Sequence, residues 1–407
     1  MLPAALLFAA SQAQTPVTVS TSPQNADQVW YSLANGEVER APLAEWDLAF
    51  ELSGFTSSIR VNTARGLDVY ETPLDTSEWN DVLAADPDNW TPIHNSEETW
   101  VVGALNHGND LDLPEGVNMG WGNYDQATHF IMGTRIYAIL FPDNSWKKLL
   151  IRSLISNVYT FTVANLDGTD SHTGTLNKQL YPDRNFAYFS FATNAVLDRE
   201  PPRTDWDLLF TKYTAFVPTA YDVVGVLQNK GVTALQVNDV PTADAAWTSG
   251  PFSSNINILG ADWKSYDFNQ SAYVIVGDTT YFVKDVPGNI WKIVFTGYGG
   301  GATGDISFNQ EAVSAVGINE QGQAQGSVLV YPNPVTDGQA QVVLDLPAAN
   351  SVARVFNATG QQMLEQQWSG HIGLSIRTLD VHGLAKGIYL LRIDTDRSNT
   401  TAKLVID

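Results

Sequence analysis

The sequence predicts an all-β protein with two homologous, mainly antiparallel β-domains and a small C-terminal β-sandwich. Short alternating apolar runs are separated by turn residues, and no long stretch keeps the 3.6-residue helical period. The 12 Trp, 15 Tyr and 17 Phe favour strands. A set of aromatic landmarks also occurs twice. The 407 residues are enough for two or three cores, and without cysteine these cores must be held by burial rather than by disulfides.

The N-terminus carries a short apolar run from Leu2 to Ala10, followed by the small residues of Ser11-Gln12-Ala13. The run is too short to span a bilayer, and the small residues fit a signal peptidase site. We predict a signal peptide at residues 1–13, with a plain apolar N-terminus as the alternative. No other stretch approaches eighteen apolar residues.

The body of the chain repeats one pattern. The hexapeptide Glu45–Phe50 (EWDLAF) returns as Asp205–Phe210 (DWDLLF). Four further landmarks keep the same order: the aromatic strands Val29–Leu33 and Ala187–Phe191, Trp79 and Trp247, Trp121–Asp125 and Trp263–Asp267, and Pro142–Lys147 and Pro287–Lys292. We predict homologous domains at 24–178 and 179–316, a duplication whose period is too long for a solenoid.

Each copy has strand and hairpin signals. Trp46, Leu48 and Phe50 alternate with Asp47, which places the three apolar side chains on one face of a strand. Turn residues between apolar runs predict two hairpins. These join Tyr137–Phe141 to Trp146–Ile151, and Tyr281–Lys284 to Trp291–Phe295.

The landmarks resemble the haem-binding HmuY-like family of Bacteroidetes. The matching residues are the aromatic strand, the W-D-L-A-F run at Trp46–Phe50, the I-R-V-N segment at Ile59–Asn62 and the late hairpin, with Asn229 as the partner of Asn62 in the second copy. The resemblance implies a largely β fold. In the members that bind haem, it also implies an iron held by two axial His or Met side chains.

Only the first copy has the usual ligands of haem iron, an imidazole or a thioether at each axial position, and the second copy is left with the rarer tyrosine ligation. The second copy has no His, Met or Cys between Leu180 and Gln325. The first copy carries an insert near 85–120, or else the second copy has lost this segment. The candidate axial ligands are His94, His107, Met119, His129 and Met132, beside Trp90 and Trp100, which could stack on a porphyrin. The alternative is a surface excursion with solvated His residues and gap-filling Met residues.

Other candidate sites are weaker. Asn109–Asp112 with Glu115 has the oxygen density of a calcium loop but lacks the spacing of an EF-hand. Gly299–Gly304 matches G-x-G-x-x-G but leads into another strand, so we expect a hairpin connection and no phosphate site. Asp47 and Asp207 would serve as acid and base in an enzyme, but at strand spacing they fit backbone binding better. We expect no catalytic residues and no enzyme activity.

The net charge is −22, and nearly all of it lies before residue 327. Such a charge repels nucleic acid and anionic membrane surfaces. We therefore expect no nucleic-acid partner.

The C-terminal 327–407 region follows a polar linker at 317–326 and predicts a small β-sandwich without catalytic equipment. Pro332 and Pro334 cannot donate to a sheet, so a strand must begin after them. Turn residues separate the alternating runs Val342–Leu346, Val352–Phe356, Ile388–Ile393 and Ala402–Ile406.

This region resembles the type A C-terminal sorting domain of type IX secretion substrates in Bacteroidetes; a generic β-sandwich is the alternative. The resemblance is carried by Y-P-N-P at Tyr331–Pro334, N-x-T-G at Asn357–Gly360, G-I-Y at Gly387–Tyr389 and K-L-V-I at Lys403–Ile406. It implies export by the type IX machinery to the cell surface or medium. Because no stretch beyond the N-terminal run approaches eighteen apolar residues, we also expect no integral membrane segment. The implied sorting residues are Tyr331, Pro332, Asn333, Pro334, Gly387, Tyr389 and Lys403.

The sequence therefore leaves two functions open. One is a secreted or surface-held binding protein with haem in the first copy. The other is a cofactor-free surface module that binds glycans or proteins or has a structural role. The second hypothesis predicts an aromatic surface patch rather than a closed pocket.

Overall fold

The computed structural model describes residues 14–54, 56–110, 117–216, 219–314, 327–346, 350–357, 359–369, 373–395 and 399–407. Strands account for 51% and helices for 8%, and no helix in the described ranges reaches seven residues. The all-β prediction is therefore confirmed. The signal peptide expected at 1–13 and the linker expected at 317–326 lie outside the described residues.

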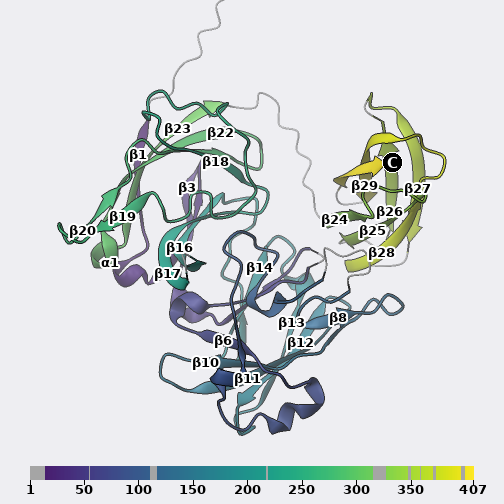
Figure 1. Ribbon diagram of the computed structural model, residues 1–407, viewed down its shortest axis with the longest axis horizontal. Coiled ribbons are helices and arrows are strands. Elements are labelled where there is room, and N and C mark those ends of the chain that lie inside the picture. The colour runs from purple at the N-terminus through teal and green to yellow at the C-terminus, as the bar shows by residue number, and fades with distance from the viewer. Residues whose placement is uncertain are drawn as a thin grey trace, which may run out of the picture. The chain divides into compact units, whose positions relative to one another are not determined.

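The chain divides into two compact units, each assembled from separate segments (Figure 1). The first unit combines the segment that ends at Ala44, the short Glu97–Thr99 stretch and the segment that begins at Pro201. The second combines Glu45–Ser96 and Trp100–Glu200 with the C-terminal region. The repeat boundaries at 24–178 and 179–316 stay a prediction. The compact units have other bounds: most of the predicted first copy lies in the second unit, and most of the predicted second copy lies in the first unit.

The first unit contains a five-stranded sheet, β1-β23-β22-β21-β18, a four-stranded sheet, β17-β16-β2-β3, and a separate β19–β20 hairpin. Figure 1 shows β1, purple because it starts the chain, beside the green β23 with which it pairs. The elements are β1 (Thr15–Ser20), η1 (Pro23–Asn25), β2 (Asp27–Ser32), β3 (Gly36–Pro42), η2 (Leu43–Glu45), β16 (Leu208–Phe216), β17 (Ala220–Gln228), β18 (Thr233–Val237), β19 (Lys264–Asp267), β20 (Ala272–Ile275), β21 (Thr280–Lys284), β22 (Ile290–Tyr298), α1 (Gly300–Thr303) and β23 (Asp305–Ser314).

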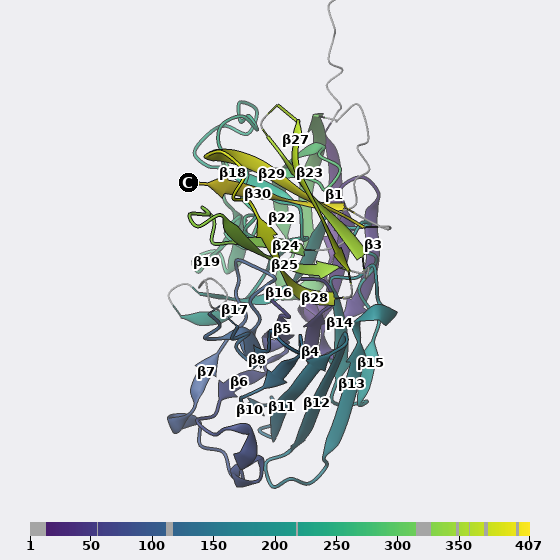
Figure 2. The ribbon, with the colours of Figure 1, turned by 90° about the vertical axis from the view of Figure 1, so that its right-hand side faces the viewer.

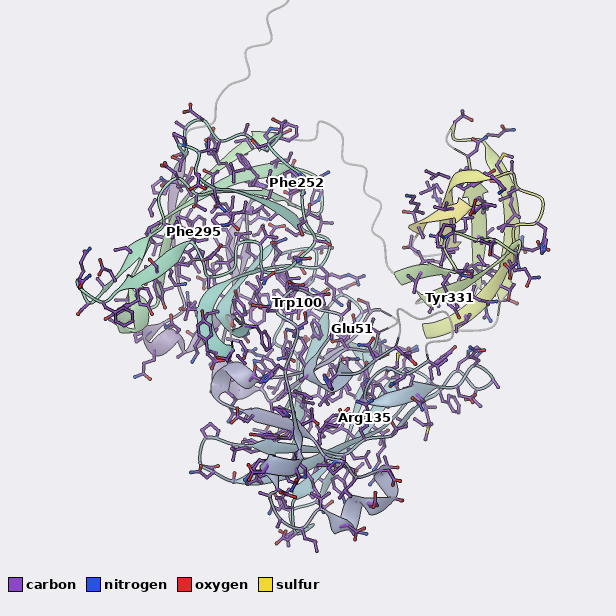
Figure 3. All side chains as sticks on the ribbon, viewed as in Figure 1. Glu51, Trp100, Arg135, Phe252, Phe295 and Tyr331 are labelled. Carbon is purple, nitrogen blue, oxygen red and sulfur yellow. The ribbon has the colours of Figure 1, made fainter. Side chains whose placement is uncertain are left out.

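Aromatic side chains from both sheets fill the core of the first unit. The Tyr31 ring lies 5.8 Å from the rings of Phe210 and Phe308. Phe295, labelled in Figure 3, stacks on Trp263 at 4.2 Å between ring centroids. The predicted hairpin forms as β21 and β22, with Tyr281 opposite Ile293.

The second unit contains an eight-stranded sheet and a four-stranded sheet, β15-β14-β4-β5 (Figure 2). The main path of the larger sheet is β13-β12-β11-β10-β6-β7, and the β8–β9 hairpin joins it at β11. The elements are β4 (Leu48–Glu51), β5 (Ile59–Val61), η3 (Thr63–Arg65), β6 (Asp68–Glu71), η4 (Thr76–Asp81), η5 (Pro87–Asn89), β7 (Thr91–Ile93), η6 (Ala104–Asn106), β8 (Gly122–Tyr124), β9 (Ile131–Gly133), β10 (Tyr137–Leu140), β11 (Trp146–Ile155), β12 (Val158–Asn165), β13 (His172–Asn177), η7 (Lys178–Leu180), β14 (Phe186–Ser190) and β15 (Ala195–Leu197).

The second core repeats the first. Phe50 stacks on Phe161 at 5.1 Å, and Phe189 meets Phe161 edge-on at 4.7 Å. The predicted β10–β11 hairpin is present. Leu48 and Phe50 share this core, whereas Trp46 packs on Tyr188 in a separate cluster. The single face expected for all three apolar residues is therefore wrong for Trp46, because it precedes β4 and does not follow the alternation of that strand.

The two units are closed by equivalent segments that come from different places in the chain. In the second unit, β13, β14 and β15 follow β12 directly, and Phe189 pairs with Leu48. In the first unit, β1, β2 and β3 take these places, and Tyr31 pairs with Leu208. The N-terminal strands thus complete a unit whose remaining strands begin more than 150 residues later.

The C-terminal region is a β-sandwich with its own core, as predicted. Its sheets have the orders β24-β25-β28 and β27-β26-β29-β30. Val342, Val355, Leu391 and Leu404 are fully buried in the core. The strands are β24 (Ser327–Tyr331), β25 (Gln339–Leu346), β26 (Asn350–Phe356), β27 (Gln362–Ser369), β28 (Gly373–Asp380), β29 (Gly387–Thr395) and β30 (Asn399–Ile406).

None of the helices in the described part of the chain is both long and apolar enough to cross a membrane.

Candidate functional site

The insert of the first copy covers the edge of β5. Asn95 donates through Nδ2 to Val61 O at 2.6 Å and accepts at Oδ1 from Val61 N at 3.1 Å. Asn106 Oδ1 accepts from Ile59 N at 2.9 Å. At Gly103 a Cβ atom would lie 2.1 Å from Ile59 O, so the insert packs directly on the strand. Because an open strand edge invites unwanted pairing, the insert has a structural function here.

Two candidate haem ligands lie on the β8–β9 hairpin, and a third lies just before it. Met119 is 3% exposed and packs in the core with Trp121 and Ile131. His129 has a φ of 61°, and its Nδ1 lies 2.6 Å from the Tyr124 hydroxyl. Met132, on β9, is 50% exposed.

The other two candidates lie elsewhere. His94 follows β7, which is separated from β11 in the sheet by β6 and β10. Partial burial lowers the pKa of His94. His107 follows η6, and its Nδ1 lies 3.5 Å from Glu71 Oε2. Arg135, labelled in Figure 3, donates to both Glu71 Oε2 and His107 O, at 2.8 and 2.9 Å.

These residues do not fit a haem site in this arrangement. The thioether of Met119 fills the hydrophobic core and would have to leave it to reach an iron. Trp90 packs on Trp146 at 5.6 Å, and Trp100 (Figure 3) packs on Phe186 at 5.9 Å, so both indole rings are engaged in packing. The ligand set from His94 to Met132 therefore stays a prediction with no support from the packing.

The two W-D carboxylates bind backbone far away in the chain. Asp47 Oδ2 accepts from Phe191 N at 2.6 Å, and Asp207 Oδ2 accepts from Leu33 N at 2.8 Å. Both donors, Phe191 N and Leu33 N, lie directly after an aromatic closing strand. Each carboxylate therefore fastens the closing segment of its unit, and we assign both residues a structural role.

Two asparagines repeat at the same place in the two units, as the sequence predicts. Asn62 Nδ2 donates to Trp46 O at 2.9 Å, and Asn229 Nδ2 donates to Trp206 O at 2.7 Å. The pattern W-D…N therefore describes one repeated tertiary contact.

The two carboxylates differ in their electrostatic surroundings. Burial raises the pKa of Asp207 to about 6, and the nearby Asp285 carboxylate adds to the effect. Burial also raises the pKa of Asp47, but Arg65 Nη1 lies 2.5 Å from its Oδ1 and opposes the shift. Arg65 is three residues after Asn62, whereas Val232 stands three residues after Asn229. The first unit therefore holds its carboxylate without the cation that the second unit supplies.

The remaining motifs show no site. The glycine-rich segment forms α1, one four-residue helical turn that the sequence did not predict, and leads into β23 as expected. Among the described residues, no three His, Cys, Asp or Glu side chains gather as metal ligands. The calcium loop proposed at Asn109–Asp112 and Glu115 lies mostly outside the described residues.

The β19–β20 hairpin of the first unit carries an exposed aromatic cluster. Phe268, in the turn, is 85% exposed, and Tyr266 and Tyr273 are each 43% exposed. The ring of Tyr266 lies 5.1 Å from that of Phe268 and 5.2 Å from that of Tyr273. Tyr273 continues the row to Tyr298, at 4.8 Å. We call Tyr266, Phe268, Tyr273 and Tyr298 the aromatic ridge.

Hydrogen bonds and packing hold the ridge in place. Asp267 Oδ1 accepts from Asn269 N at 2.8 Å, and its Oδ2 accepts from Gln270 Nε2 at 2.7 Å, which braces the turn. Lys264 Nζ lies 4.1 Å from the Trp263 ring centroid and donates to Val224 O at 2.5 Å. Burial lowers the pKa of Lys264 to about 7.

The corresponding hairpin of the second unit has a different surface. Tyr124 occupies the place of Tyr266 but is 5% exposed, and its hairpin is paired to β11. Trp121 and Trp263 are both buried at the start of these hairpins. The sequence comparison used Trp263–Asp267 only as a repeat landmark. The alternation of Tyr266 and Phe268 with polar residues was the signal that could have identified the ridge.

The sorting-domain motifs form one connected structure. Asn333 Nδ2 donates to Lys403 O at 2.8 Å, and its Oδ1 accepts from Val405 N at 2.8 Å. Asn357 Oδ1 accepts from Thr359 N at 3.1 Å, which makes N-x-T-G a tight turn. Tyr331, labelled in Figure 3, ends β24. The Y-P-N-P and K-L-V-I motifs are therefore joined through the side chain of Asn333.

Residues 329–407 match the family model described as the secretion system C-terminal sorting domain. This match confirms the sorting domain and supports export by the type IX secretion system, with secretion or cell-surface localisation. No characterised protein matches the chain in the sequence comparison. One solved structure, "Biofilm associated protein - BSP domain", is similar over 98% of this chain and 67% of that chain, at 12% identity. Its TM-score of 0.16 carries no argument about the fold.

Proposed function

We propose that the chain is an exported, cofactor-free binding protein that docks a protein partner on the aromatic ridge of its first unit. The observation that carries the proposal is the exposed, braced cluster of rings around Phe268. Contiguous exposed apolar surface of this kind marks interaction sites. This is the aromatic patch expected of a cofactor-free surface module.

The ring geometry favours a protein over a glycan. Neighbouring rings of the ridge meet at 80°, 74° and 68°, so their faces do not form one flat platform for a row of sugar rings. Phe268 is the most exposed ring of the ridge, at 85%, so an apolar pocket on a partner protein could receive it. The hairpin alternates tyrosines with Ser265, Asn269 and Gln270. Rigid aromatic contacts combined with adaptable polar ones are typical of protein-recognition loops.

Charge defines the partner further. The chain carries −22, and Asp262 and Asp278 flank the hairpin in sequence. A partner with an apolar pocket and a neutral or basic rim is therefore favoured, because like charges across an interface oppose association.

The HmuY-like relationship is part of the proposal as a statement about architecture. Its support is the repeated contact of the W-D carboxylate with the closing strand. Haem is not included, because Met119 is a core residue and the second copy has no His or Met ligands. We also propose that the protein is not an enzyme, since the two conspicuous carboxylates, Asp47 and Asp207, are both bound to backbone.

The test compares the full chain with the ridge variant Phe268→Ser/Tyr273→Ser and with Val286→Ser, a control at an apolar residue in the same unit that is 53% exposed. Each protein is immobilised and exposed to the outer-membrane and secreted proteins of the cells that export it. Proteins retained by the wild type are purified and their Kd is measured against all three chains. A neutral-glycan array is probed in parallel.

A purified protein that binds the wild type and the control but loses at least tenfold in affinity with the ridge variant supports the proposal. Equal binding by the ridge variant would refute it. Glycan binding that depends on the ridge, without a protein partner, would replace the protein by a glycan.

A further inference from the structure

The first unit is closed by a segment from a remote part of the chain. In the second unit the closing strands are joined to β12 by the short turn between Asn165 and His172, which makes their pairing local. After β23 the printed sequence continues into a polar linker and the sorting domain, without a third copy of these strands. The strand edges of β16 and β23, which we call the acceptor of the first unit, therefore pair with strands from residues 15–44.

This closing segment supplies a large part of the core. Val29 and Trp30 are completely buried, and Val19, Tyr31 and Leu33 are at most 2% exposed. Strand β1 pairs along its whole length with β23, from Thr15–Gln310 to Ser20–Asp305. Without the segment, β16 and β23 would each present an unpaired edge next to an open core, which is a strong site for strand addition.

Polar pairing distinguishes the acceptor of the first unit from that of the second. Tyr31 OH donates to Gln310 Oε1 at 2.8 Å, and Gln310 Nε2 donates to Leu33 O at 3.1 Å. In the second unit Phe189 takes the place of Tyr31. Val163, which pairs with Leu149 as Gln310 pairs with Ile293, takes the place of Gln310. In the wrong acceptor, the Tyr31 hydroxyl would face Val163 without a partner, which is unfavourable for a buried polar group.

We propose that residues 15–44 are an exchangeable donor segment and that a second copy of this chain can insert its donor into the first unit. The inference does not rest on the proposed partner-binding function. Within one chain the donor competes at a high effective concentration, so the closed monomer dominates in dilute solution. At high protein concentration, or when the segment opens transiently, two chains exchange donors and form a dimer by domain swapping.

The chain has no cysteine, so engineered thiols report the exchange without background. The hydroxyls of Thr18 and Ser307 lie 2.9 Å apart across the β1–β23 pair. Full chains carrying Thr18→Cys are mixed with full chains carrying Ser307→Cys, incubated at high concentration with mild denaturant, returned to buffer and oxidised. The matched control mixes Thr18→Cys with Thr160→Cys, because Thr160 has the corresponding place on β12 but is paired with Thr175 of β13.

We expect a disulfide-linked heterodimer from the Ser307→Cys mixture, at least tenfold more abundant than from the Thr160→Cys mixture and increasing with protein concentration. Circular dichroism of each single variant checks that both fold. A heterodimer yield equal to that of the control, or no heterodimer at any concentration, would overturn the proposal.

Discussion

Replacing Asp207 by Asn should change how the stability of the first unit depends on pH. Burial raises the pKa of this carboxyl from 3.8 to about 6 in the folded state. A difference of about 2 pKa units corresponds to roughly 3 kcal/mol. The folded state binds the proton more tightly than the unfolded state. The loss of folding stability caused by ionising Asp207 is therefore absent below about pH 4, grows as the pH rises toward about 6, and is complete by about pH 7.

Asp207→Asn retains an oxygen that accepts from Leu33 N but cannot ionise. We therefore expect the stability of the variant relative to the wild type to increase by about 3 kcal/mol between pH 4 and pH 7. Hydrogen exchange of the β2 and β16 amides, corrected for intrinsic rates, measures this locally. Asp47→Asn is the matched comparison and should gain less, because it also removes the ion-pair partner of Arg65. A difference for Asp207→Asn that stays constant across this pH range would refute the reasoning.

Three further outcomes are expected. Tyr31→Phe and Gln310→Val should each destabilise the first unit, and the double variant should recover about 1 kcal/mol relative to additivity in denaturant titrations; additive effects would mean that the hydrogen bond between them does not contribute. Haemin titrated into the full chain should give no saturable Soret band, and a sharp one-equivalent shift would restore haem as the ligand. Asn333→Ala removes two hydrogen bonds to β30, so it should destabilise the sorting domain by about 1–3 kcal/mol, as measured by faster exchange of the β30 amides; unchanged exchange would contradict this.

Local features of the fold were predictable from the sequence. The hairpins β10–β11 and β21–β22 follow from alternating apolar runs around Pro and Gly turns, which are short-range signals. Four strands of the sorting domain follow for the same reason. The W-D…N pattern also identified a real contact, since Asn62 and Asn229 occupy equivalent positions.

Strand partnership was not predictable from the repeat. Because the two copies share the same landmarks, the aromatic strand ending at Leu33 suits either acceptor by pattern alone. The choice depends on the short β12–β13 connection and on the Tyr31–Gln310 hydrogen bond, which appear only in three dimensions.

The candidate haem site stays a prediction without support from the packing, for a related reason. A cluster of His and Met in the sequence shows which side chains have the chemistry to bind iron, but burial decides whether those side chains are accessible to a ligand. Met119 is hydrophobic enough for a core position, and it packs in the hydrophobic core of the second unit. Tyr266 and Tyr124 occupy the same repeat position, yet only Tyr266 is substantially exposed. The hairpin of Tyr124 is paired to β11 of the larger sheet, whereas the hairpin of Tyr266 forms a separate two-stranded sheet.

The most direct test of the architecture is intramolecular cross-linking in a single chain. Thr18→Cys/Ser307→Cys should oxidise to a monomeric disulfide in near-complete yield in dilute solution. Thr18→Cys/Thr160→Cys should remain reduced under the same conditions. Cross-linking of Thr18→Cys to Thr160→Cys instead would mean that the N-terminal strands close the unit that follows them in sequence, and it would contradict the account.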